Sequence, residues 1–234
     1  MAKLPIIMYH QVDLNENTGL IISTEKLEAQ FEFLAENGYH SYHLSELIQL
    51  RKLLGKKNIV ITFDDGYVNQ LEYAYPLLQK YNLKATFFIP LKYIGGEDTW
   101  NSPASPVMDQ EALKSFDPTV VELAYHSYEH KKYTELSPEQ IETDTRRAFE
   151  VVSENDLSFG PYLAYPYGKF PRKDPERTWF FQQLQKNNFQ YGLRIGNRLN
   201  TFPFKDPFEI QRIDIKGEYS LSRFKRKIRY GKLL

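Results

Sequence analysis

The chain has 234 residues, of which 41% are hydrophobic and 15% aromatic, so it can bury a sizeable core and is not intrinsically disordered. Thirty basic and thirty acidic side chains give a formal net charge of zero, which excludes an overall field that would attract nucleic acid. The absence of cysteine excludes disulfide bonds and thiolate metal ligands. We therefore expect a single globular domain over residues 1–234.

The first residues of the chain are compatible with two cellular locations. Residues 1–5 run directly into an apolar segment, without the hydrophobic region and small-residue cleavage site of a signal peptide. No stretch is long and apolar enough to suggest a transmembrane span. These features predict a cytoplasmic protein, or an extracytoplasmic one if a leader was removed.

Residues 216–234 are strongly basic, because seven lysines and arginines are opposed only by Glu218. Such runs usually form the solvated face of a helix, and this is the interpretation we favour. Contact of this segment with a membrane surface is the less favoured alternative.

Short apolar runs alternate with longer amphipathic stretches along the chain. The expected strands cover residues 4–9, 39–42, 58–63, 84–89, 120–125, 162–165, 190–195 and 208–215. The expected helices cover residues 24–37, 45–54, 69–81, 138–155 and 174–187, with Ser23 and Ser137 as N-caps. This order is typical of βα units and predicts an α/β fold with mostly parallel strands, a distorted or incomplete (β/α)7-type barrel.

Residues 90–105 contain Gly95, Gly96 and two prolines but no periodic pattern. Structureless segments of this length in compact domains are often functional, so we expect a loop at the rim of an active site.

Polar residues follow two of the expected strands at their carboxyl ends, where α/β folds keep their chemistry. Asp64 and Asp65 end the strand at 58–63, and His126 and His130 follow the strand at 120–125. Alone, the Asp pair could be a magnesium site or a helix cap, and the histidines could be ordinary ones. Together they indicate a hydrolytic metal site, because imidazole and carboxylate suit zinc and three protein ligands leave one position open.

Three motifs in a fixed order give the chain a family resemblance. They are Thr-Phe-Asp-Asp-Gly at 62–66, His-Ser-Tyr-Glu-His at 126–130 and Tyr-Pro-Tyr-Gly at 165–168. Their order resembles the polysaccharide deacetylases of carbohydrate esterase family 4, the NodB homology family. The opening Met-Tyr-His-Gln-Val at 8–12 is similar to the poly-N-acetylglucosamine deacetylase branch. The resemblance covers residues 4–216 and implies one NodB homology domain.

The resemblance also implies roles for particular residues. Asp64 would be the general base, and Asp65, His126 and His130 would hold a divalent metal. Zinc is favoured, with nickel or cobalt as alternatives. The backbone N–H of Tyr167 would help to hold the oxyanion of the tetrahedral intermediate.

Two departures from the common family pattern affect the mechanism. Ala164 stands where many members have an arginine that orients the base, and Arg212 is the best replacement, although an ordinary ion pair with Asp214 is an equal alternative. No histidine follows His130, whereas most members use a late histidine as general acid. His10 is our candidate for that acid, and a structural histidine is the alternative.

The function predicted is metal-dependent removal of acetyl groups from N-acetylglucosamine units of a surface or cell-wall glycan. One alternative is an O-acetyl esterase acting on an acetylated polysaccharide such as xylan. Another is a glycan-binding module with a degenerate catalytic site. Trp100 and Trp179 can line a carbohydrate groove, but the sequence does not place them.

Overall fold

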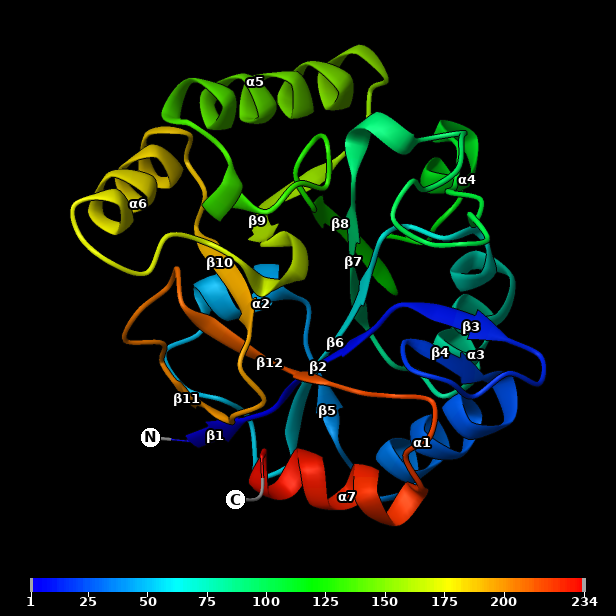
Figure 1. The fold of residues 1–234 in the computed structure, drawn as a ribbon. Helices are drawn as coiled ribbons and strands as arrows, with labels where there is room; N and C mark the ends of the chain where they lie inside the picture. The colour runs from blue at the N-terminus through cyan, green and yellow to red at the C-terminus, as the bar shows by residue number, and fades with distance from the viewer. Residues whose placement is uncertain (1, 233–234) are drawn as a thin grey trace.

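The computed structural model describes residues 2–232. Within that stretch, seven parallel strands close into a barrel, in the spatial order β2, β12, β10, β9, β8, β7 and β6, with β6 pairing back to β2 (Figure 1). The barrel strands are β2 (Ile6–Tyr9), β6 (Asn58–Asp64), β7 (Ala85–Ile89), β8 (Val121–Tyr125), β9 (Phe159–Ala164), β10 (Tyr191–Ile195) and β12 (Ile210–Asp214). The pairing register shifts between Ala124 and Tyr125, which distorts the barrel locally. The predicted (β/α)7-type fold is confirmed.

Strand β6 shows how the sequence divides the core into two layers. Successive side chains of a strand point to opposite faces. Ile59, Ile61 and Phe63 therefore pack outward in one apolar cluster with the helices, whereas Val60 belongs to a separate inner cluster. Asp64 shares the inward face with Val60, so its carboxylate lies at the mouth of the barrel.

Seven helices of the described chain surround the barrel (Figure 1). They are α1 (Thr24–Glu36), α2 (Leu44–Gln49), α3 (Tyr75–Lys80), α4 (Gln110–Lys114), α5 (Pro138–Glu154), α6 (Glu176–Lys186) and α7 (Leu221–Tyr230). The two predicted N-caps are confirmed: Ser23 accepts the N–H of Lys26, and Ser137 forms a reciprocal capping box with Gln140.

Some expected elements differ in extent from those observed. The strand expected at 4–9 is interrupted at Pro5, which has no N–H to donate. Before it, β1 (Ala2–Leu4) pairs antiparallel with β11 (Asn200–Phe202) outside the barrel. The helix expected at 45–54 ends at Gln49. The helix expected at 69–81 begins with a π-helical turn at Gln70–Ala74.

Three short strands lie outside the barrel on the remaining connections. They are β3 (Gln11–Asp13), β4 (Ile21–Ser23) and β5 (His40–Ser41). β3 and β4 pair with each other, and β5 pairs with the first two residues of β6. Among these, only β5 was expected, as part of the strand predicted at 39–42.

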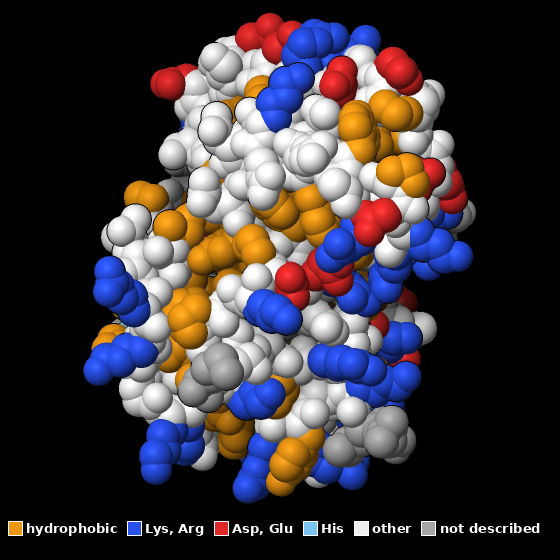
Figure 2. Space-filling view, turned by 90° about the vertical axis from the view of Figure 1, so that its left-hand side faces the viewer, with side chains coloured by type: hydrophobic (Ala, Val, Ile, Leu, Met, Phe, Trp, Pro, Cys, Tyr) orange, Lys and Arg blue, Asp and Glu red, His pale blue; other side chains and the backbone are white. Residues whose placement is uncertain are grey.

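The basic C-terminal segment forms α7, as its charge pattern suggested. Phe224 and Ile228 are buried, and the helix packs against α1. Figure 2 shows basic side chains gathered at the lower end of the molecule, the level at which α7 lies in Figure 1. Among residues 2–232, no helix is long and apolar enough to cross a membrane. Contact of this segment with a membrane surface stays the less favoured alternative.

Candidate metal centre and active site

A pocket of about 530 Å³ opens where the barrel strands end. Its walls come from the carboxyl ends of β2, β6, β8 and β12 and from the loop around residues 100–105. All seven residues proposed from the sequence line this one pocket, namely His10, Asp64, Asp65, His126, His130, Tyr167 and Arg212.

Asp65, His126 and His130 form a buried cluster with the spacing of a metal site. Asp65 Oδ1 lies 3.2 Å from His130 Nε2 and 3.4 Å from His126 Nε2. Metal–ligand bonds of about 2.0–2.1 Å in a tetrahedron place ligand atoms about 3.3–3.4 Å apart. Asp65 Oδ1 has no hydrogen-bond partner in the described part of the chain. The three residues can therefore bind a divalent metal ion such as zinc.

The protonation states of the cluster also suit a cation. Burial lowers the pKa of His126 to about 4, so its imidazole is neutral at pH 7. Burial alone would raise the pKa of the Asp65 carboxyl, but the neighbouring histidines, mainly His130, outweigh it and hold that pKa well below its usual range. Neutral imidazole and ionised carboxylate are the forms that bind metal.

Hydrogen bonds from the scaffold orient the loop that carries the histidines. His126 Nδ1 lies 2.8 Å from the carbonyl oxygen of Ala164, which leaves Nε2 to face the cluster. The Asp144 carboxylate, on α5, accepts the backbone N–H groups of Tyr128 and Glu129, both at 2.9 Å. Sequence reasoning missed Asp144, because nothing in its helical pattern links it to this loop.

The imidazole of His130 is held by aromatic stacking. The ring of Trp100 lies 3.8 Å from it at an interplanar angle of 34°, and the ring of Tyr167 lies 4.8 Å from it. Trp100 Nε1 donates to Tyr67 Oη at 3.1 Å, and Tyr67 Oη donates to the buried Asp98 at 2.8 Å. His130 Nδ1 has no hydrogen-bond partner among residues 2–232, so the neighbouring rings fix its orientation.

Tyr67 and Asp98 are further residues that sequence reasoning missed. Tyr67 directly follows the Asp-Asp-Gly turn, and Asp98 lies in the expected rim loop. Burial, and then the charge of Asp65, raises the pKa of the Tyr67 hydroxyl, so it stays protonated as a donor to Asp98. The network therefore ties the rim loop to the turn that supplies the metal-site carboxylate.

The second carboxylate of the pair is bound by a buried arginine. Arg212 Nη1 donates to Asp64 Oδ1 at 2.5 Å, and Nη2 donates to Oδ2 at 2.7 Å. Arg212 is fully buried and Asp64 is 2% exposed. Burial raises the pKa of Asp64, but the guanidinium charge prevails and lowers it. Within the described chain, no ion pair joins Arg212 to Asp214.

His10 and Tyr167 complete the wall of the pocket. His10 Nε2 lies 3.9 Å from Asp64 Oδ2. Gln70 Nε2 donates to the carbonyl oxygens of His10 and Asp64, at 2.8 and 2.6 Å, and so joins the ends of β2 and β6. Tyr167 adopts a left-handed backbone (φ 57°), and the residue is 44% exposed. Of the two tryptophans, only Trp100 lines this pocket.

Comparisons with known proteins give a consistent picture. Residues 51–178 match the family model described as "Polysaccharide deacetylase". The Bacillus subtilis protein YxkH, which carries the name of a polysaccharide deacetylase, is 28% identical over 198 residues, 82% of this chain and 64% of its own length. The poly-beta-1,6-N-acetyl-D-glucosamine N-deacetylase of Staphylococcus epidermidis is 23% identical over 205 residues, 84% of this chain and 68% of that enzyme.

A solved structure shares the whole fold. The Streptococcus pyogenes deacetylase PplD, determined in complex with acetate, superposes with a TM-score of 0.77. The superposition covers 97% of this chain and 98% of that one, at 20% sequence identity. Because the family model spans more than half of the sequence, and relatives named for the same activity match most of it, the chain belongs to the polysaccharide deacetylase family of hydrolases.

Proposed function

We propose that this chain removes acetyl groups from N-acetylglucosamine units of a surface or cell-wall glycan by metal-dependent amide hydrolysis. One observation supports this most strongly: of two adjacent buried carboxylates, Asp65 belongs to the histidine cluster and Asp64 is bound by Arg212. This division provides a ligand and a base from one turn. The name of the staphylococcal relative supports N-acetylglucosamine as the acetylated unit.

Asp65, His126 and His130 would hold the cation, with zinc favoured over nickel or cobalt for this ligand set. When bound, a divalent cation polarises the acetamide carbonyl and makes water more acidic. The remaining position of a four-coordinate site would be open toward the pocket.

Asp64 accepts the proton of the attacking water. Arg212 keeps its carboxylate ionised at neutral pH by lowering its pKa, and the two hydrogen bonds fix its orientation. Asp64 Oδ2 lies 3.7 Å from His126 Nε2, so its carboxylate is adjacent to the three-residue cluster, which supports this role. A general base must lie within hydrogen-bonding reach of the water molecule that it deprotonates.

Two further groups of the protein stabilise or neutralise the negative charge that develops on the substrate during the reaction. The backbone N–H of Tyr167 lies in the first turn of a short helical segment, where N–H groups lack intrahelical partners, and it donates to the oxyanion of the tetrahedral intermediate. His10 donates a proton to the sugar nitrogen as the carbon–nitrogen bond breaks, because an unprotonated amide nitrogen is a poor leaving group. The products are acetate and a glycan with a free amine.

The substrate is tested with a panel of acetylated glycans. Acetate release is measured from β-1,6-linked and β-1,4-linked N-acetylglucosamine oligomers and from O-acetylated xylan. We expect release from the N-acetylated oligomers. Cleavage of the xylan ester without any amide cleavage would instead establish an esterase, and binding of all oligomers without acetate release would establish a glycan-binding module.

A further inference from the structure

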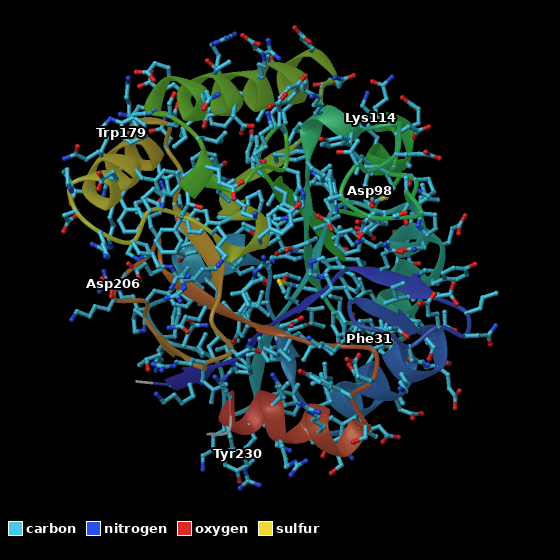
Figure 3. All side chains as sticks on the ribbon, viewed as in Figure 1. Phe31, Asp98, Lys114, Trp179, Asp206 and Tyr230 are labelled. Atoms are coloured by element: carbon cyan, nitrogen blue, oxygen red, sulfur yellow. The ribbon has the colours of Figure 1, made fainter. Side chains whose placement is uncertain are left out.

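A second and larger groove, of about 980 Å³, lies between the start of α5 and the start of α6. Its floor contains the buried side chains of Tyr133, Ile141 and Phe170. Trp179 of α6 forms part of its wall, and Figure 3 shows this side chain on the part of α6 that lies next to α5. None of the metal-cluster residues lines this groove, so the proposed chemistry does not account for it.

The groove adjoins the metal pocket across two side chains. Lys132 lines the groove, and its Nζ lies 5.4 Å from the centre of the Tyr167 ring. The same ring lies 4.8 Å from the ring of His130, inside the metal pocket. Lys169 of the groove directly follows the Tyr-Pro-Tyr-Gly turn. A polymer seated in the metal pocket can therefore continue past Tyr167 into the groove.

The lining of the groove suits an uncharged sugar segment. Ligand sites combine an apolar surface with a few polar groups at defined positions, and an aromatic ring offers a flat face to the C–H groups of a sugar. The indole of Trp179 and the apolar floor supply the first part. The lysines and arginine of the rim can donate to hydroxyl and acetamide oxygens, and its glutamates can accept from hydroxyl groups.

The charge of the rim is positive. Lys132 is paired with Glu135 at 2.9 Å. Lys169, Arg172 and Lys173 form no ion pair within the described stretch, and Glu176 is the only other carboxylate of the lining. Deacetylation turns a neutral acetamide into an ammonium group, which the positive rim repels. A deacetylated unit therefore binds beside this rim less tightly than an acetylated one.

We propose that the groove is a second glycan-binding site, which holds acetylated units of the same chain whose target unit occupies the metal pocket. Its three unpaired cations disfavour units that already carry a free amine. The site therefore favours long, acetylated chains and limits further deacetylation near an amine. The proposal rests on the proposed function of the metal pocket.

The dependence of activity on glycan chain length tests the role of Trp179 in the wall of the groove. For a fully acetylated β-1,6-linked hexamer relative to the dimer, we expect a higher kcat/KM in the unaltered protein, and Trp179→Ala should reduce that advantage about fivefold or more. The control is Tyr230→Ala, which removes an exposed aromatic ring of α7, at the opposite end of the molecule in Figure 3. An unchanged hexamer-to-dimer ratio in Trp179→Ala would overturn the proposal.

Surface charge gives a second test, at two exposed residues of the rim. On a partially deacetylated hexamer, the double variant Arg172→Gln and Lys173→Gln should raise kcat/KM by about two- to fivefold. The gain should disappear at about 1 M salt, where charges are screened over roughly 3 Å. Lys114→Gln, an exposed lysine of α4 distant from the groove in Figure 3, is the matched control. Equal rates for the double variant and the unaltered protein at low salt would contradict charge selection.

Binding is measured separately from turnover, in Asp64→Asn protein. The chain has two tryptophans, so its NMR spectrum contains two indole N–H signals, and Trp179→Phe identifies one of them. Titration with the hexamer should shift the Trp179 signal, and titration with the dimer should leave it in place. If the unaltered protein released no acetate, the proposed function would fail. If the hexamer left the Trp179 signal unmoved, the groove proposal would fail independently.

Discussion

Arg212 holds both carboxylate oxygens of Asp64 through two hydrogen bonds, although 148 residues separate them in the chain. The contact follows from strand order, because β12 and β6 both pair with β2 and each directs its residue into the barrel mouth. A buried guanidinium is a strong counter-charge, so it both permits a buried ionised base and fixes its orientation.

Replacing Arg212 with methionine should move the acid limb of the pH profile. Without the guanidinium, burial dominates and the pKa of Asp64 rises, so the base is lost at a higher pH than in the unaltered protein. An unpaired buried charge should also reduce the free energy of unfolding by about 3–5 kcal/mol. Rate profiles of kcat/KM against pH and urea denaturation measure the two effects.

The control for that variant is Arg177→Met, which breaks a partly exposed pair with Glu209. It should change stability by about 1 kcal/mol or less and leave the acid limb in place. An acid limb that stays unmoved in Arg212→Met would show that Arg212 does not set the ionisation of the base.

The metal-free protein should lose stability on acidification because of His126. Its folded-state pKa, about 4, lies below the usual value of 6.5, so the unfolded chain binds the proton more tightly. The resulting stability is present above pH 6.5, declines as the pH falls toward 4, and amounts to about 3 kcal/mol at most. Denaturation of chelator-treated protein at several pH values measures it. His126→Asn should flatten this part of the curve, and an equally steep decline in that variant would refute the assignment.

Trp100→Ala should weaken metal binding without altering any ligand. Groups that orient metal ligands typically contribute about 10- to 100-fold in affinity, and Trp100 is stacked on His130. Competition with a chromophoric chelator gives the dissociation constant directly, and Trp100→Phe should recover part of the affinity. Trp179→Ala is the matched control, since its ring lines the other groove. Equal zinc affinity in the two alanine variants would contradict the stacking role.

His10→Asn should impair amide cleavage more than ester cleavage. An amine must be protonated as it leaves, whereas an alkoxide needs protonation less. Loss of a general acid should therefore slow amide cleavage more than ester cleavage, and loss of a structural histidine should slow both alike. Rates on an N-acetylated oligomer and on an activated acetate ester provide the comparison. Full turnover of the amide substrate by His10→Asn, with the same limb in its pH profile, would rule out the acid role.

The sequence predicted the barrel and the location of the metal cluster because both depend on local patterns. Alternating apolar runs marked the strands, and Asp65 and His126 follow strands whose carboxyl ends meet at one rim. The contact between Arg212 and Asp64 depends on which strands are neighbours, and a local pattern does not determine that. The resemblance nevertheless led to Arg212, because Ala164 lacks the usual arginine side chain.

Other features could not be obtained from sequence at all. The loop at 90–105 was expected at the rim, but the stacking of Trp100 on His130 depends on hydrogen bonds that link Tyr67 and Asp98. Asp144 supports the histidine loop from a helix that begins several residues after it. The pairing of residues 2–4 with β11 was not predicted either, because β11 had no sequence signal.

The separate roles of Asp65 as metal ligand and Asp64 as base are tested most directly by measuring bound zinc and acetate release in the same samples. Acetate release from a β-1,6-linked N-acetylglucosamine oligomer should stop on chelation and return with added zinc. Asp65→Asn should lose both zinc and activity, whereas Asp64→Asn should retain about one zinc per chain and lose activity by a factor of roughly 100 or more. Acetate release that is insensitive to chelation, or full activity in Asp64→Asn, would contradict the account.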